Sequence, residues 1–191
     1  GHFLVDEIYH GLTYEVDAQS ACAAGDNIWV INSFSKYFQM TGWRLGWMVI
    51  PEPYVRDVEK LAQNLTLCPS TPAQHGALAA FLPETIALLE ERRAAFRQRR
   101  DFLAPALEAI GLRVTARPEG AFYLYCDCSA LTDDSFTLAR DLLEKAGVAV
   151  TPGIDFGANA PEKHIRFAYT TDLDRLAEAV ARLGRFFGSR T

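Results

Sequence analysis

The sequence predicts an α/β protein, in which three strands of a mostly parallel sheet and several helices are followed by a smaller α+β domain. Hydrophobic residues make up 49% of the 191 residues, enough to build a sizeable core. Short apolar, β-branched runs dominate the chain before Pro51, and helical patterns follow. In the last third, short strand-like runs alternate with helical ones.

Three apolar runs are predicted as strands in the first part of the chain. Phe3–Ile8 is near-continuously apolar, which is typical of a parallel strand with neighbours on both sides. We therefore expect the chain to be the later part of a longer protein. Ile28–Phe34 is predicted as a second buried strand, and Arg44–Ile50 as a third that ends at Pro51. Only about ten residues separate these two, which is short for a helical crossover and favours antiparallel pairing.

Three helices are predicted next. The first covers Pro51–Asn64 with proline in its first turn, the second Ala73–Leu82 and the third about Pro83–Ile110. Pro105 is expected to kink the third helix or to split off its last turns, and Gly111 to end it. Apolar residues spaced three, four or seven apart form one stripe on this helix, namely Ile86, Leu89, Phe96, Leu103, Leu107 and Ile110.

Charged residues occupy the rest of the long helix, among them Arg97, Arg100 and Asp101. The arginines suggest an anion-binding patch, but a solvated helix face interspersed with glutamate is the favoured interpretation. A domain boundary is predicted within this helix near Ala95. It divides the chain into residues 1–95 and a smaller C-terminal domain of residues 96–191.

The last third has the pattern of an α+β domain. Ser135–Ala146 is predicted as a helix closed by Gly147, and Thr170–Asp174 as the cap region of a final helix. The final helix carries an apolar stripe of Leu176, Val180, Leu183 and Phe187. Strands are predicted at Arg113–Ala116, Gly120–Cys126, Val148–Thr151 and His164–Tyr169.

Composition and spacing argue against several classes of function. The net charge is −5 without a basic stripe, which argues against nucleic acid as a partner. No apolar run is long enough to span a bilayer, so we expect no membrane partner. Neither the histidines nor the four cysteines have metal-ligand spacing, and Cys126 and Cys128 lack a second ligand pair. Free thiols are therefore predicted, with no metal, and reduced thiols indicate a cytoplasmic protein.

Six short segments carry most of the residues that could perform chemistry, and they span almost the whole chain. They are Val5–Tyr9, Ser33–Lys36, Thr41–Gly46, Pro118–Tyr123, Gly147–Gly153 and Ile165–Phe167. In order and spacing they resemble the class I/II (aspartate aminotransferase-like) family of fold-type I pyridoxal-phosphate enzymes. The resemblance implies that residues 1–95 are part of the cofactor-binding large domain and residues 96–191 the small domain.

The resemblance also implies pyridoxal 5′-phosphate as the cofactor and assigns roles to five residues around it. Lys36 is the catalytic residue, which forms a Schiff base with the cofactor and carries the substrate's Cα proton. Asp6 faces the ring nitrogen, and Tyr9 donates a hydrogen bond to the ring hydroxyl oxygen. Ser33 and Arg44 bind the phosphate. Four of these residues also have a purely structural alternative. Asp6 could be a helix cap or turn residue, and Tyr9 a core or surface tyrosine. Lys36 could be an exposed loop lysine, and Arg44 part of a surface ion pair.

Elementary chemistry agrees with these roles. The cofactor is an electron sink that works best with a protonated ring nitrogen, which a carboxylate such as Asp6 stabilises. Arg44 can hold a phosphate through two parallel hydrogen bonds. Asp6 and Tyr9 would point to opposite faces of a straight strand, so both can reach one ligand only if the strand ends before Tyr9. An unpaired Arg166 in an apolar strand would be costly, and a fixed salt bridge is the alternative to the substrate carboxylate that the resemblance implies.

The implied reaction transfers an amino group between an amino acid and a 2-oxo acid, in a protein that is a homodimer when intact. A β-lyase on the same scaffold would use the same residues. The effector domain of a transcriptional regulator would need a helix-turn-helix segment upstream. In the family, a glycine-rich turn, a stacking aromatic ring and an asparagine precede the aspartate strand. We therefore expect this chain to hold part of the site, and an inactive fragment remains a third alternative.

Overall fold

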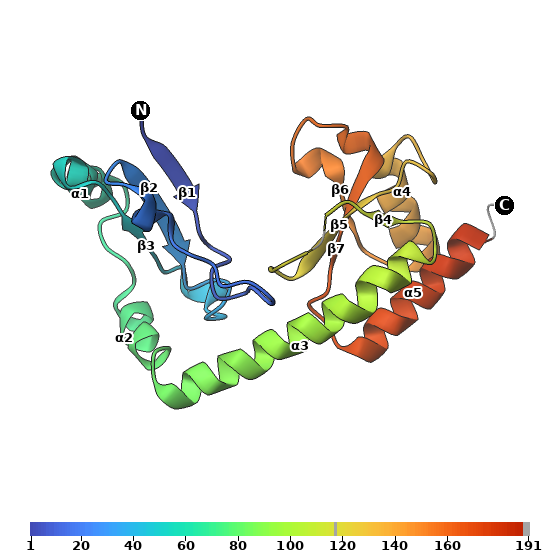
Figure 1. Cartoon of the computed structure of the whole chain (residues 1–191), viewed down its shortest axis with the longest axis horizontal. Coiled ribbons are helices and arrows are strands. Elements are labelled where there is room, and N and C mark those ends of the chain that lie inside the picture. Colours follow the sequence, from blue (N-terminus) through green and yellow to red (C-terminus); the bar gives the residue numbers. More distant parts are fainter. Residues whose placement is uncertain (117, 189–191) are drawn as a thin grey trace. The chain divides into compact units, whose positions relative to one another are not determined.

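The computed structural model describes residues 1–116 and 118–188, which form two compact units (Figure 1). The first unit comprises Gly1–Arg93, and the second begins at Ala94. Helices and short strands occur in both units, which confirms the predicted α/β class.

The sheet of the first unit has three strands in the order β1-β2-β3. Strand β1 covers Phe3–Asp6, β2 covers Ile28–Ser33 and β3 covers Gly46–Val49. Strands β1 and β2 are parallel, whereas β2 and β3 are antiparallel. The antiparallel pairing expected from the short connection is therefore confirmed.

The first strand has one neighbour among the residues that the structure describes, and the expected second neighbour is not among them. Strand β1 pairs only with β2, and Phe3 and Leu4 are 68% and 66% exposed. Strand β3 is exposed along its whole length. An apolar run shows that a strand can be buried, but it does not supply the surface that covers it.

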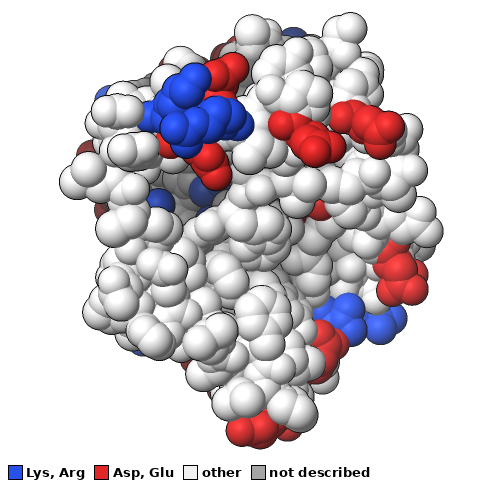
Figure 2. Space-filling model, turned by 90° about the vertical axis from the view of Figure 1, so that its left-hand side faces the viewer, with Lys and Arg blue, Asp and Glu red and all other residues white. Residues whose placement is uncertain are grey.

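Apolar side chains are also exposed on the first helix of this unit. Helix α1 covers Val55–Leu65 after a 3₁₀ turn at Glu52–Tyr54. Figure 2 views the face on which α1 and β3 lie and shows a broad stretch without charged side chains. The exposed apolar side chains of β3 and α1 include Trp47, Met48, Val49, Leu61 and Leu65. Large apolar side chains exposed in this number mark an interface more often than a solvated face.

The remaining helices of the first unit pack around the turn that follows β2. Helix α2 covers Thr71–Ala79, and helix α3 begins at Pro83. A small core joins the two parts, with Phe34 and Met40 from the turn and Ala77 from α2. The segment after β2 is thereby fixed from one side by apolar contacts.

Helix α3 covers Pro83–Glu108 and is not divided at Pro105. Of the two outcomes predicted for Pro105, a kink or a split, the split is therefore wrong. Proline removes one helical hydrogen bond, but the bond from the Ala109 amide to the Pro105 carbonyl (3.0 Å) continues the ladder. Leu107 is fully buried, so packing offsets the missing bond. Gly111 follows the helix with a φ of +89°, the left-handed conformation expected of a terminating glycine.

The second unit contains an antiparallel sheet in the order β4-β5-β7-β6. Its strands are β4 (Arg113–Val114), β5 (Tyr123–Asp127), β6 (Thr151–Pro152) and β7 (His164–Ala168). The strand predicted at Val148–Thr151 is thus shorter and later, because the Val148 amide is bonded to the Leu142 carbonyl of the preceding helical turn.

Two helices complete this unit. Helix α4 covers Ser135–Asp141 and continues as a π-helical turn, Leu142–Ala146, which ends at left-handed Gly147. Helix α5 covers Leu173–Gly188, and the Asp172 carboxylate accepts a hydrogen bond from the Arg175 amide, as expected of a cap. No helix in residues 1–116 or 118–188 is both long enough and apolar enough to cross a membrane.

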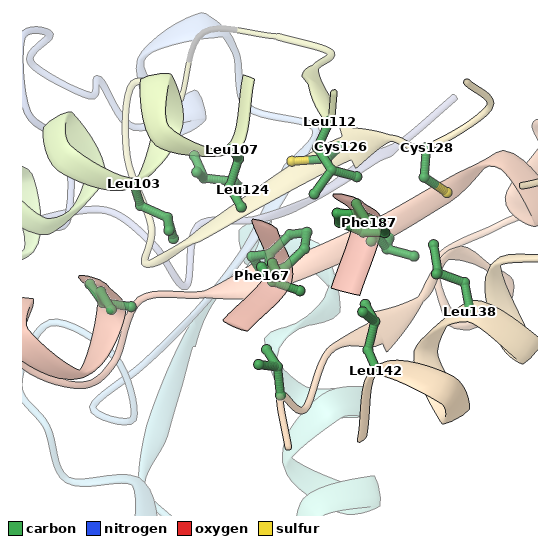
Figure 3. Close-up of a cluster of buried hydrophobic side chains, with 14 of the residues drawn as sticks. Leu103, Leu107, Leu112, Leu124, Cys126, Cys128, Leu138, Leu142, Phe167 and Phe187 are labelled. Carbon is green, nitrogen blue, oxygen red and sulfur yellow. The ribbon is translucent and has the colours of Figure 1, made fainter. Parts of the chain in front are cut away.

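The core of the second unit lies between the sheet and its helices (Figure 3). It contains the predicted stripe residues Leu103 and Leu107 of α3 and Leu183 of α5. Arg100 differs from its predicted place on a solvated face, because it is only 5% exposed. Its Nη1 donates to the Pro118 carbonyl (2.7 Å), so the guanidinium holds a distant loop rather than facing solvent.

The core cysteines give a testable outcome. Burial raises the pKa of Cys126 to about 12 and that of Cys128 to about 11, so neither supplies thiolate at pH 8. Cys22 and Cys68 are free and exposed. We expect an alkylating reagent at pH 8 to label Cys22 and Cys68 within minutes, and the core pair only after unfolding in urea. Peptide mass spectrometry reports the order, and early labelling of Cys126 would contradict the buried core.

Candidate active site

The predicted cofactor residues of the first unit lie at one edge of its sheet. Asp6 ends β1 and Ser33 ends β2, and these parallel strands have their carboxyl ends at the same edge. Because β3 is antiparallel and Gly46 pairs with Ser33, the start of β3 and the preceding Arg44 lie at that edge too. In open α/β sheets, ligands bind outside the carboxyl ends of parallel strands.

A tight turn follows Asp6 and places Tyr9. The Asp6 carboxylate accepts a hydrogen bond from the Ile8 amide (3.0 Å), which bends the chain directly after the strand. The strand thus ends before Tyr9, as the shared-ligand argument requires. Asp6 itself is exposed, in contrast to the buried strand predicted for it. Among the described residues its carboxylate makes this one hydrogen bond, so it can accept another from a ligand.

Lys36 lies in the turn that follows β2 and is half-buried. Its Nζ atom is 5.7 Å from the centroid of the Tyr9 ring, within the range of a cation–π contact. The structure therefore brings together two of the residues that the sequence predicts around one ligand, although they are 27 positions apart in the chain.

Hydrogen bonds between small side chains shape the Lys36 turn. The Ser35 amide donates to Ser33 Oγ (3.0 Å). Ser33 Oγ lies 2.8 Å from Ser35 Oγ and 3.2 Å from the Leu45 carbonyl, and its single proton can be donated to either. The Thr41 hydroxyl donates to the Ser35 carbonyl. Ser33 therefore has a structural role in the turn in addition to its predicted phosphate contact.

Arg44 lies where β3 approaches the end of β2. Its backbone is left-handed (φ +54°), and its Nη1 donates to the Thr41 carbonyl (2.8 Å). No carboxylate in the described part of the chain is in ion-pair range of this exposed guanidinium, so the surface ion pair is not formed. A Cβ on Gly46 would lie 2.7 Å from the Asn32 carbonyl oxygen, so only glycine permits this close approach.

Glu7 is a residue of the site region that the sequence predictions omit. It is only 4% exposed, and its carboxylate accepts hydrogen bonds from the Ala21 amide (2.6 Å) and the Ser20 hydroxyl (3.1 Å). His10 Nδ1 lies 3.3 Å from the same carboxylate. Glu7 thus ties the loop at Ser20 and Ala21 to the turn that carries Tyr9. The available signal was an acidic residue inside an apolar run, where burial demands partners.

Arg166 lies in the second unit, on β7, and is described by itself. Its Nη2 donates weakly to Thr151 Oγ1 (3.4 Å), and its Cζ lies 4.5 Å from the Phe156 ring centroid and 5.3 Å from that of Tyr123. No carboxylate among the described residues pairs with it, so the fixed salt bridge is absent. Its Nε is buried without an acceptor. Such a donor is costly unless a ligand supplies the acceptor.

Comparison with known proteins identifies relatives over nearly the whole chain. The sequence profile of the family described as aminotransferase class I and II matches residues 1–183. A valine–pyruvate aminotransferase from Mycobacterium tuberculosis is 40% identical over 187 residues, 97% of this chain and 48% of the relative. An aspartate/prephenate aminotransferase from Thermus thermophilus is 37% identical over 190 residues, 98% and 48% of the two chains.

Solved structures agree with these sequence matches. The crystal structure of an aminotransferase from Mycobacterium tuberculosis has a TM-score of 0.92 at 39% identity and covers 97% of this chain and 49% of its own. The chain spans about half the length of the curated relatives it matches. The family is pyridoxal-phosphate-dependent.

The polar side chains at this edge of the sheet fit that cofactor. A phosphate requires hydrogen-bond donors with positive charge, and Arg44 has Nε and Nη2 without partners among the described residues. A ring nitrogen requires a carboxylate, which the exposed Asp6 offers. An aldehyde requires an amine, which Lys36 offers beside the Tyr9 ring. The chemistry of the four side chains is thus complementary to the cofactor's groups, and no described cluster of His, Cys, Asp or Glu offers a metal site instead.

The role of Glu7 can be tested by equilibrium unfolding in urea. Glu7→Ala leaves the half-buried Ala21 amide without an acceptor, and we expect it to lower the free energy of unfolding by about 1–3 kcal/mol. Glu7→Gln should lose less because its amide oxygen still accepts a hydrogen bond. Glu52→Ala, at an exposed position, is the matched control. Equal losses for Glu7→Ala and Glu52→Ala would show that the Glu7 network does not stabilise the fold.

Proposed function

The chain belongs to the class I and II aminotransferase family, and from this premise we propose that the full-length protein is a pyridoxal-phosphate-dependent aminotransferase. It moves an amino group between an amino acid and a 2-oxo acid. The observation that carries the proposal is the position of Lys36, whose Nζ is 5.7 Å from the Tyr9 ring at the sheet edge where Asp6 and Ser33 end their strands.

Residues of the first unit would hold the cofactor. Ser33 and Arg44 bind its phosphate, because a hydroxyl and a guanidinium together supply neutral and charged donors. The Asp6 carboxylate faces the ring nitrogen, and the Tyr9 hydroxyl donates to the ring oxygen. In this proposal residues 1–95 are part of the cofactor-binding domain, and the rest of that domain belongs to the half of the relatives' length that the chain does not span.

Lys36 performs the chemical work of the chain. When bound, the cofactor supplies an electron sink that weakens the Cα–H bond of the amino acid joined to it. Lys36 Nζ would hold the cofactor through its aldehyde group and, when free of it, would take the proton from the substrate Cα. The hydrogen-bonded turn from Ser33 to Thr41 keeps the lysine backbone in place for both tasks.

Arg166 would recognise the part that all substrates share. Amino acids and 2-oxo acids both carry a carboxylate next to the reacting carbon, and a guanidinium binds carboxylate through paired hydrogen bonds. The buried Nε without an acceptor supports this assignment. Residues 96–191 then form the substrate-binding small domain.

We also propose a homodimer in the cytoplasm. The exposed apolar side chains of β3 and α1 support an interface, since monomeric proteins rarely leave such a surface uncovered. Four free cysteines, two of them exposed, support a reducing compartment.

Reductive trapping tests the role of Lys36 without measuring activity. Borohydride treatment of the full-length protein loaded with cofactor should fix the cofactor's mass on the peptide that contains Lys36, because reduction makes the bond to Nζ permanent. Lys36→Ala should abolish this labelling and the visible absorbance of the bound cofactor. Lys60→Ala, at an exposed lysine paired with Asp57, is the control that keeps both. Undiminished labelling of Lys36→Ala would remove Lys36 from the proposal.

Single-turnover reactions distinguish amino transfer from β-lyase chemistry on the same residues. With a panel of amino acids and no 2-oxo acid present, we expect one equivalent of 2-oxo acid per cofactor and no ammonia. A lyase would release ammonia and a fragment of the side chain over many turnovers. Chromatographic quantification of 2-oxo acid and ammonia in the same sample decides between them.

A further inference from the structure

The way in which Arg166 is held is unusual for a half-buried arginine. Such a side chain normally pairs with a carboxylate, yet no described carboxylate is in range, and its only hydrogen bond among the described residues is the long one to Thr151 Oγ1 (3.4 Å). Two aromatic rings surround the charge instead. The Phe156 ring centroid lies 4.5 Å from Cζ, and the Tyr123 centroid lies 5.3 Å from it.

The Phe156 ring is itself fixed by the turn that precedes it. The 3₁₀ turn Gly153–Asp155 follows β6, and its glycine is packed so closely that a Cβ would lie 2.4 Å from the Pro161 carbonyl oxygen. The same Cβ would lie 2.9 Å from the Tyr125 hydroxyl. The Tyr125 ring contacts Phe156 edge to face, with centroids 5.9 Å apart. Phe156 therefore lies on a turn that close packing holds against the sheet.

An aromatic ring holds a guanidinium differently from a carboxylate. The attraction is between the positive charge and the π face, so it uses none of the N–H donors. A protein carboxylate in the same place would occupy two of these donors and repel a substrate carboxylate. The buried Nε without an acceptor is the expected result of this arrangement.

We propose that Phe156 is a positioning residue for Arg166: its ring holds the guanidinium in the place of a protein carboxylate, so that the N–H donors remain available to the substrate's carboxylate. The inference rests on the proposed function, in which Arg166 binds that carboxylate. Phe156 acts through Arg166. Because no protein carboxylate pairs with the guanidinium, the site favours a negatively charged ligand. Ordinary packing is the competing explanation, but Phe156 is 44% exposed and lies outside the buried core of the unit.

The test compares substitutions at Phe156 in the full-length protein. Phe156→Leu keeps an apolar side chain but removes the π face, whereas Phe156→Tyr keeps the ring. We expect Phe156→Leu to raise KM for amino acids about three- to tenfold, the usual size of a partly desolvated cation–π contact. The value of kcat should change less than about twofold, because the lost contact stabilises bound substrate and transition state equally and no reacting group is changed. Phe156→Tyr should restore KM.

A binding measurement provides a readout independent of catalysis. The probes are 3-phenylpropanoate and 4-methylpentanoate, carboxylates without an amino group, titrated calorimetrically into the cofactor-free protein. Phe156→Leu should weaken the tighter-binding probe by the same factor by which it raises KM. Phe136→Leu is the matched control, because Phe136 is 60% exposed at the start of α4 and has no contact with Arg166. It should leave both readouts unchanged.

Arg166→Lys separates this inference from the proposed function. If Arg166→Lys weakens the probe and Phe156→Leu does not, the positioning role is overturned and the carboxylate clamp stands. If Arg166→Lys leaves probe affinity and KM unchanged, the clamp itself is wrong and the role of Phe156 is rejected with it. Equal losses for Phe156→Leu and Phe156→Tyr would also overturn the proposal, because the ring would then not be the group that matters.

Discussion

The close approach of β3 to the end of β2 is the constraint on which the first unit's site depends. Gly46 passes so near the Asn32 carbonyl that a Cβ would overlap it, and the register pairs Gly46 with Ser33. The Phe34 amide then donates to the Leu45 carbonyl (3.1 Å), which extends the contact past the end of the strand. A larger residue would push the two strands apart at the point where Lys36 and Arg44 leave the sheet. This contact therefore helps to place Ser33, Lys36 and Arg44, together with the hydrogen bonds of the turn itself.

Glu7 of the first unit and Arg166 of the second are held in opposite ways. Glu7 is almost fully buried, and two hydrogen-bond donors from one loop, the Ser20 hydroxyl and the Ala21 amide, satisfy its carboxylate. Arg166 has a buried Nε without an acceptor and is held by aromatic rings. The satisfied charge organises the protein around it, since moving it would break several bonds at once. The unsatisfied one retains capacity for a ligand, and this difference separates a structural charge from a functional one.

Several elements could be predicted from the sequence because their causes are local. The strand after which Lys36 lies, the stripe of α3 and the glycine that ends it follow from periodicity and from the conformations that single residues allow. The end of β1 before Tyr9 follows from the alternation of side chains in a strand, if Asp6 and Tyr9 are to reach one ligand. Other predictions were wrong where tertiary contacts dominate. Packing of Leu107 keeps α3 continuous through Pro105. Arg100 is buried and donates a hydrogen bond to the carbonyl of Pro118, 18 positions away.

The sequence by itself determined which residues could carry the chemistry, because an amine, a carboxylate and two guanidiniums in recognisable segments define a small set of reactions. It also determined the order of strands and helices, since these depend on spacing within short windows. Only the tertiary structure decided what surrounds each charge. Ser20 and Ala21, which donate to Glu7, lie 13 and 14 positions from it. Phe156 reaches Arg166 on β7 from the turn that follows β6. Contacts of this kind depend on how strands pair and loops pack, which local patterns do not encode.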